Sequence, residues 1–163
     1  MRDITPDNRI DKVIPRSLNG AYQGSPFAWW VLLVLGALNL FRGSIHLFAS
    51  DGGAGQIAGI DLSEGGDVIV FLFAVMGLQQ LAFGALDLVV ALRYRVFVPL
   101  LLALETLKLG VVVIVMWFYK PLPVAAPGKY GALVVFPVLV LALFMSLRSR
   151  AQPGIGGAAV DSS

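Results

Sequence analysis

The chain has 163 residues, of which 58% are hydrophobic and 13% are charged, and its mean hydropathy is +0.83. This balance is too apolar for a soluble domain of this length and predicts an integral membrane protein. The chain has no cysteine and one histidine, which excludes disulfides, thiolate metal sites and a haem held by two histidines of one subunit. The net charge is +2, but the basic residues lie beside the ends of apolar runs, which indicates membrane orientation and no nucleic-acid partner.

Residues 1–26 are polar and contain three prolines, so we predict a cytoplasmic N-terminal tail without a long helix. The apolar run 27–49 follows, and it is long enough to cross a bilayer, which takes about 20 residues. We expect this run to stay in the protein, because a signal peptide has neither such a polar start nor an internal arginine.

Residues 50–66 contain six glycines and no lysine or arginine, and they predict a flexible external loop. Asp61 and Glu64 have the spacing of a helix capping box, so the next helix begins either near Leu62 or, after two glycines, at Asp67. Carboxylates among glycines can bind calcium, but their spacing here matches no calcium loop, and we expect no metal site.

Three further apolar runs predict spans at 67–92, 97–119 and 131–147. The turn 93–95 between the first two is so short that these helices must be antiparallel neighbours. Residues 120–130 form a proline-rich linker, and Pro137 is expected to bend the last helix or to lie in its first turn. The predicted fold is therefore an all-α, antiparallel four-helix bundle over 27–147, followed by a flexible cytoplasmic tail, 148–163.

Basic residues near the spans number eight on the side of the two termini and two on the opposite side. Cytoplasmic segments carry an excess of lysine and arginine. We therefore expect both termini in the cytoplasm, the acidic loop outside, and a location in the cell membrane, as a multi-pass protein of a bacterial inner membrane.

Small and polar residues share one face of each of the first two spans, because positions three and four apart coincide on a helix. These faces consist of Gly36, Asn39, Gly43 and His46, with Arg42 adjacent, and of Gly77, Gln80, Gly84 and Asp87. Small residues let helix backbones approach and amides bond across the contact, so we predict that the two faces pack together. The third span adds Glu105 and Lys108, which can pair on one helix.

Arg42 is the costliest of these residues to bury in a bilayer, so it needs an anion, water or a headgroup. Its candidate partners are Glu105 within the membrane and, on the outer side, the acidic loop, a lipid phosphate or an acidic ligand.

Asp87 and Lys108 each have a structural and a functional reading. Near the inner surface Asp87 is expected to pair with Arg93 or Arg95 or to reach water, and otherwise to belong to an intramembrane polar network. The pair of Lys108 and Glu105 is equally consistent with a structural role, in which it fixes how the helices pack, and with a functional role.

His46 is predicted to lie near the outer surface, where a hydrogen-bonding role is commoner for histidine than a ligand role. No nucleophile has an adjacent base, so we assign no catalytic residue. We predict a non-enzymatic membrane subunit or scaffold without a cofactor, whose polar residues bind lipid, a partner subunit or a second copy of the chain. The alternatives are a small proton-coupled or anion transporter that uses Arg42, Glu105, Lys108 and Asp87, and an enzyme that acts on a lipid or quinone at His46.

The stretch FRGSIHLFASDGGAGQIAGI, together with the size and the four-span layout, carries a resemblance that covers about residues 27–147. In these features the chain resembles the small bacterial membrane proteins grouped with the DoxX-like bundles. The resemblance implies a four-helix membrane fold and no particular activity.

Overall fold

The computed structural model describes residues 22–121 and 123–148. This part of the chain is helical and contains no strand. Its elements are α2 (Pro26–Phe48), α3 (Gly66–Leu92), the short 3-10 helix η1 (Arg95–Phe97), α4 (Val98–Ile114), the π-helical turn η2 (Val115–Tyr119) and α5 (Pro127–Leu147). Counting η1, α4 and η2 as one segment, four helices are long and apolar enough to cross a membrane. The prediction of an all-α chain with four helices long and apolar enough to cross a membrane is confirmed, whereas the predicted tails lie almost wholly outside the described residues.

The start of α3 distinguishes between the two predicted starts of the second span. Helix α3 begins at Gly66, after Gly65 in the left-handed conformation with φ +67°, and no side chain caps it. Asp61 instead accepts a hydrogen bond from the backbone N–H of Ser63 at 2.9 Å. The capping-box prediction is therefore wrong, and the alternative start beside the two glycines is correct to within one residue.

The fourth helix begins at Pro127, four residues before the predicted start. Proline fits the first helical position because its missing N–H would have no partner there. Lys129 and Tyr130 therefore belong to the first turn of α5 instead of to a linker. Pro137 lies inside the helix, where it removes one backbone hydrogen bond.

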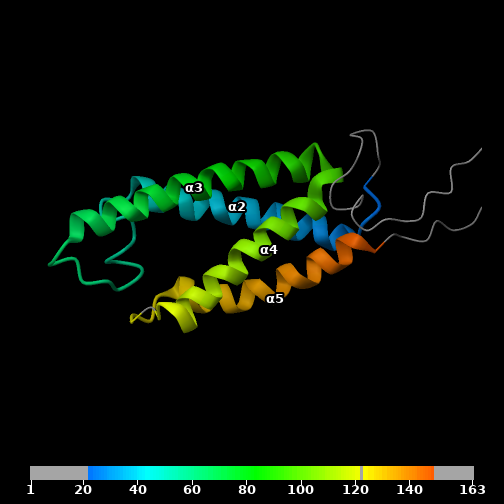
Figure 1. Ribbon diagram of the computed structural model, residues 1–163. Coiled ribbons are helices and arrows are strands. Elements are labelled where there is room, and N and C mark those ends of the chain that lie inside the picture. Colours follow the sequence, from blue (N-terminus) through cyan, green and yellow to red (C-terminus); the bar gives the residue numbers. More distant parts are fainter. Residues whose placement is uncertain (1–21, 122, 149–163) are drawn as a thin grey trace, which may run out of the picture.

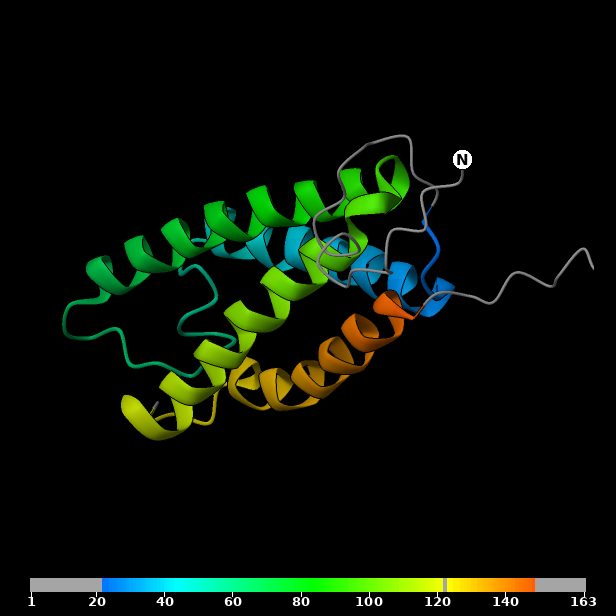
Figure 2. The same cartoon turned by 45° about the vertical axis from the view of Figure 1, so that its right-hand side comes forward.

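Helices α2 and α3 make the most extensive contact in the molecule, and they lie side by side in Figures 1 and 2. A Cβ atom built on Gly84 would lie 2.8 Å from the carbonyl oxygen of Gly36, and one on Gly77 would lie 2.8 Å from that of Gly43. Since real Cβ atoms do not approach so closely, glycine is required where the two backbones touch. The predicted contact between the two polar faces is confirmed.

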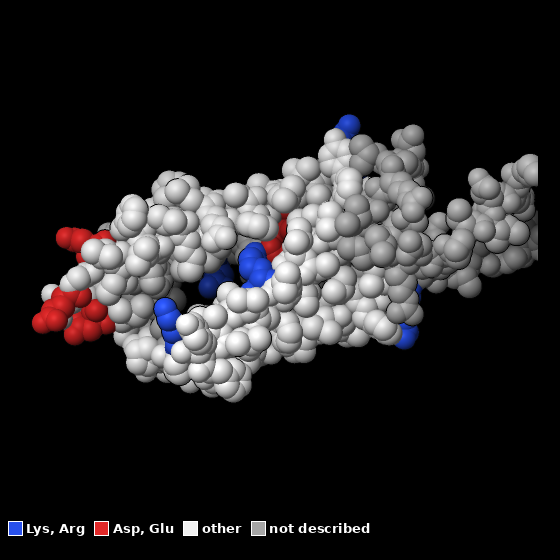
Figure 3. Space-filling view, viewed as in Figure 1, with Lys and Arg blue, Asp and Glu red and all other residues white. Residues whose placement is uncertain are grey.

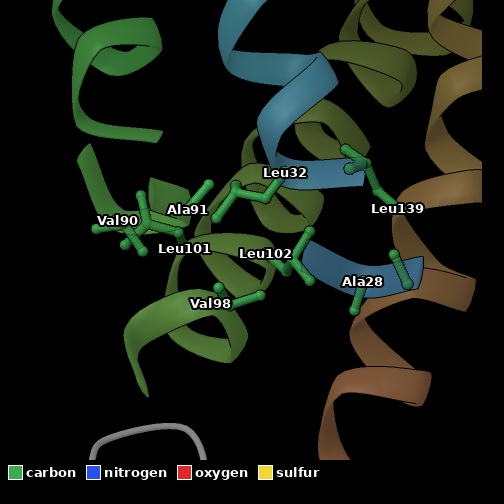
Figure 4. Packing of buried hydrophobic residues seen from close by; sticks show 9 residues of the cluster. Ala28, Leu32, Val90, Ala91, Val98, Leu101, Leu102 and Leu139 are labelled. Atoms are coloured by element: carbon green, nitrogen blue, oxygen red, sulfur yellow. The ribbon is translucent and has the colours of Figure 1, made fainter. Parts of the chain in front are cut away.

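The apolar core lies at the end of the molecule that carries the α3–α4 turn (Figure 4). All four long helices contribute to it, through Leu32, Val90, Ala91, Val98, Leu102 and Leu139 among others. At the same end, the Trp29 indole N–H donates to the carbonyl oxygen of Ala91. We call this the core end and the opposite end, with the 49–65 loop, the loop end. From the core end, α4 and α5 diverge from the α2–α3 pair (Figures 1 and 2).

Candidate functional site

A buried polar cluster lies on α2, α3 and α4 near the core end. Asp87 is fully buried, and its Oδ2 accepts a hydrogen bond from the Asn39 amide at 3.5 Å. The glycine contact produces this pair, because a Cβ atom on Gly36 would lie 2.9 Å from the Cβ of Asp87. Glu105 is 2% exposed, and its Oε1 pairs with the Lys108 ammonium at 2.5 Å. The structure thus brings together four of the predicted site residues and forms the predicted i, i+3 ion pair.

The expected pairing of Asp87 with Arg93 or Arg95 is wrong. Among the described residues the ion pair of Lys108 with Glu105 is the only one, and it leaves both arginines out. Arg95 donates to the Ala91 carbonyl at 3.2 Å, and its guanidinium lies 4.1 Å from the centre of a Trp29 ring. Asp87 instead faces Gly36 of α2, and its carboxylate accepts its hydrogen bond from Asn39.

Lys108 connects α4 to α3 where the two helices begin to separate. Its Nζ lies 4.3 Å from the centre of the Phe83 ring, in a cation–π contact. Its side chain is 37% exposed, whereas the carboxylate that it pairs with is enclosed. The cluster therefore ends in a half-exposed ammonium whose charge Glu105 already balances.

Arg42 pairs with none of its candidate partners in the chain. Glu105 pairs with Lys108 instead, and the two Asp51 oxygens accept backbone hydrogen bonds, each at 2.8 Å, from Gly53 and Gln56. These bonds, the one from Gln56 first, hold the pKa of Asp51 below its usual value. Across residues 22–121 and 123–148, the Arg42 guanidinium forms no ion pair and no hydrogen bond.

The Arg42 side chain extends from α2 to the first turn of α5. Its Nη2 lies 3.3 Å from the position that a Cβ atom would take on Gly128, so the absence of a side chain there admits the guanidinium. Figure 3 shows a hollow between α3 and the α4–α5 pair, with lysine or arginine side chains at its edge and deeper inside it. The same view shows acidic side chains gathered at the loop end, away from this hollow.

Aromatic side chains accompany the basic residues at the start of α5. The Lys129 ammonium lies 4.6 Å from the centre of a Trp117 ring, and Trp117 packs edge to face with Tyr130 at 6.0 Å. Lys129 and Gly128 are not among the predicted site residues, because residues 120–130 were expected to form a linker. Pro127, two residues before Lys129, is the signal that could have placed them in a helix.

His46 is buried beneath the loop. Its Nδ1 is hydrogen-bonded to the Gly52 carbonyl oxygen at 2.7 Å, and its ring packs edge-on against Phe73. The Nε2 of His46 and the Oε1 of Gln80 are buried without a hydrogen-bond partner in the described structure. Histidine therefore ties the loop to α2, and neither residue joins the cluster around Asp87.

Comparison with protein-family models, curated proteins and solved structures gives no match for this chain. Within the described residues, no three His, Asp or Glu side chains are grouped to hold a metal ion.

Proposed function

We propose that this chain is a non-enzymatic subunit or scaffold of a bacterial inner membrane that binds an anionic group, from a lipid or a partner, through Arg42. Its fold in the membrane is an antiparallel four-helix bundle of DoxX-like layout with both termini in the cytoplasm. The distribution of basic residues supports this orientation, because eight lie near the ends on the side of the termini and two on the other side.

The observation that carries the proposal is the unpaired state of Arg42 within an apolar helix. Arginine inside a membrane span is costly unless an anion or water accompanies it. Among the described candidate partners, Glu105 is paired with Lys108, and Asp51 and Asp61 accept hydrogen bonds from their own loop. We therefore infer that Arg42 takes its anion from a lipid or a partner.

The buried cluster supports a scaffold because its members bind one another. A second candidate, a small proton-coupled or anionic-substrate transporter, is favoured by one feature of Asp87. Its Oδ1 is buried without a partner, and the carboxyl group lies within electrostatic range of Glu105 and Lys108. A proton carrier would use such a group, and Arg42 would then bind its anionic substrate.

Arg42→Gln is expected to weaken anion binding at least tenfold without unfolding the protein. Hydrogen bonds to a charged group contribute about 1.5–3 kcal/mol, and this arginine has no internal partner to lose. The measurement is the rise in thermal stability of the full chain, purified in neutral detergent, on titration with inorganic phosphate, dodecanoate or dodecyl phosphate. Arg93→Gln, which removes an arginine at the core end, is the charge-matched control.

Equal responses of wild type and Arg42→Gln to all three anions would contradict the proposal. Reconstituted protein that conducts protons, and stops doing so in Glu105→Gln, would instead support the transporter.

For the orientation, we expect Glu64→Cys to react with a membrane-impermeant maleimide added to intact cells. Glu64 is exposed in the acidic loop, and the natural chain has no cysteine that would add background. Labelling that appears only after the cells are opened would reverse the proposed topology.

A further inference from the structure

We infer that the ligand of Arg42 is the phosphate group of a membrane lipid whose acyl chain leaves the hollow between α3 and α4. This inference rests on the proposed function and specifies the chemistry of its ligand. It follows from the charge around Arg42, from the direction in which the hollow opens and from the depth of the arginine.

Arg42 forms no ion pair with the described residues, whereas Lys108 is paired with Glu105. The Arg42 guanidinium approaches the first turn of α5 at Gly128. This helix end carries the positive end of the helix dipole, and no side chain caps it. A phosphate can accept two hydrogen bonds from the guanidinium fork. Gly128 lets the guanidinium lie next to this helix end, because Arg42 Nη2 is 3.3 Å from the position that a Cβ atom would take there.

The hollow opens on the side of the bundle and not at one of its ends (Figure 3). Large apolar side chains are exposed on the two helices that border the opening, including Val75 and Met76 of α3 and Val111 and Val112 of α4. In a membrane this side of the bundle faces lipid chains. An anion that enters here therefore comes with an apolar tail, whereas a free aqueous anion would have to cross the apolar zone first.

The depth of Arg42 fits a lipid from the leaflet at the loop end. Arg42 lies six residues before the end of α2 at Phe48, which is about 9 Å along the helix axis. A long arginine side chain can extend toward the headgroup layer, so a lipid phosphate reaches it with a small displacement. The acyl chain of this lipid then lies among the other lipid chains, on the side of the bundle where the hollow opens.

The test compares anions with and without an apolar tail on the full chain in neutral detergent. We expect dodecyl phosphate to bind at least tenfold more tightly than either inorganic phosphate or dodecanoate, and neutral dodecanol to show no dependence on Arg42. Arg42→Gln should weaken the binding of dodecyl phosphate at least tenfold. Gly128→Val should weaken binding as well without a change in charge, because its side chain would occupy space next to Nη2. Gly131→Val, next to open space one turn later, is the matched control.

The outcomes separate the inference from the function on which it rests. If inorganic phosphate binds as tightly as dodecyl phosphate and depends equally on Arg42, the ligand is a free anion, and the lipid inference fails while anion binding stands. Tighter binding of dodecanoate would also overturn the inference, in favour of a carboxylate. If no anion depends on Arg42, both proposals fail.

The path of the acyl chain is tested with a phospholipid that carries a photoreactive group in the middle of its chain. We expect crosslinks to α3 and α4 residues that border the hollow, such as Phe83, and their loss in Arg42→Gln. Crosslinks that are unchanged in this variant would show general contact with lipid and would overturn the proposed path.

Discussion

Gly84→Val is expected to destabilise the protein by about 3 kcal/mol, the upper end of the usual cost of overpacking. A Cβ atom at this position would lie 2.8 Å from the Gly36 carbonyl oxygen and 2.9 Å from the backbone nitrogen of Leu40. Because both are backbone atoms of α2, the clash can be relieved only if the two helices separate. Thermal unfolding of the purified protein in detergent, followed by circular dichroism, measures the loss.

Gly131→Val is the control for this substitution as well. Gly131 is also inside a helix, and a Cβ atom there meets no atom within 4 Å, so we expect a change within about 0.5 kcal/mol, as for other surface substitutions. Equal losses in the two variants would contradict the argument, since they would reflect β-branched residues in helices and not the α2–α3 contact. Separation of α2 from α3 should also disturb the hydrogen bond between Asn39 and Asp87.

The contact of α2 with α3 could be predicted because it depends on local spacing alone. Glycines at 36 and 43 and at 77 and 84 repeat with the helical period, and the polar residues between them share their face. The ion pair of Glu105 with Lys108 could be predicted for the same reason, since i, i+3 neighbours meet on any helix. Such features need no knowledge of how the helix pairs are placed.

The surroundings of Arg42 could not be predicted, because they depend on the divergence of the two helix pairs. The apolar core gathers at one end, so the pairs separate toward the loop end, and helix periodicity contains no information on this angle. Charge alone suggested Glu105 or the acidic loop, with Asp51 and Asp61, as partners of Arg42. In the structure Asp51 does not pair with Arg42, because its carboxylate accepts hydrogen bonds from backbone N–H groups of its own glycine-rich loop. A carboxylate followed by glycine commonly bonds the backbone two residues on, and this signal was present in the sequence.

The ion pair of the buried Glu105 with Lys108 gives the second large effect. Lys108→Met is expected to destabilise the protein by about 3 kcal/mol, because Glu105 is 2% exposed and would lose its only counterion. Thermal unfolding should show that the double variant Glu105→Leu/Lys108→Met regains most of the lost stability. With both charges gone, position 105 no longer holds a carboxylate without its counterion, and apolar side chains of similar length replace the pair.

Lys120→Met separates this effect from a general consequence of removing a lysine. Lys120 is exposed at the end of η2 and forms no ion pair with the described residues, so its loss should be nearly neutral. A double variant as unstable as Lys108→Met alone would contradict the argument, because the cost would then come from the lost contact of Lys108 with Phe83 and not from an unpaired Glu105.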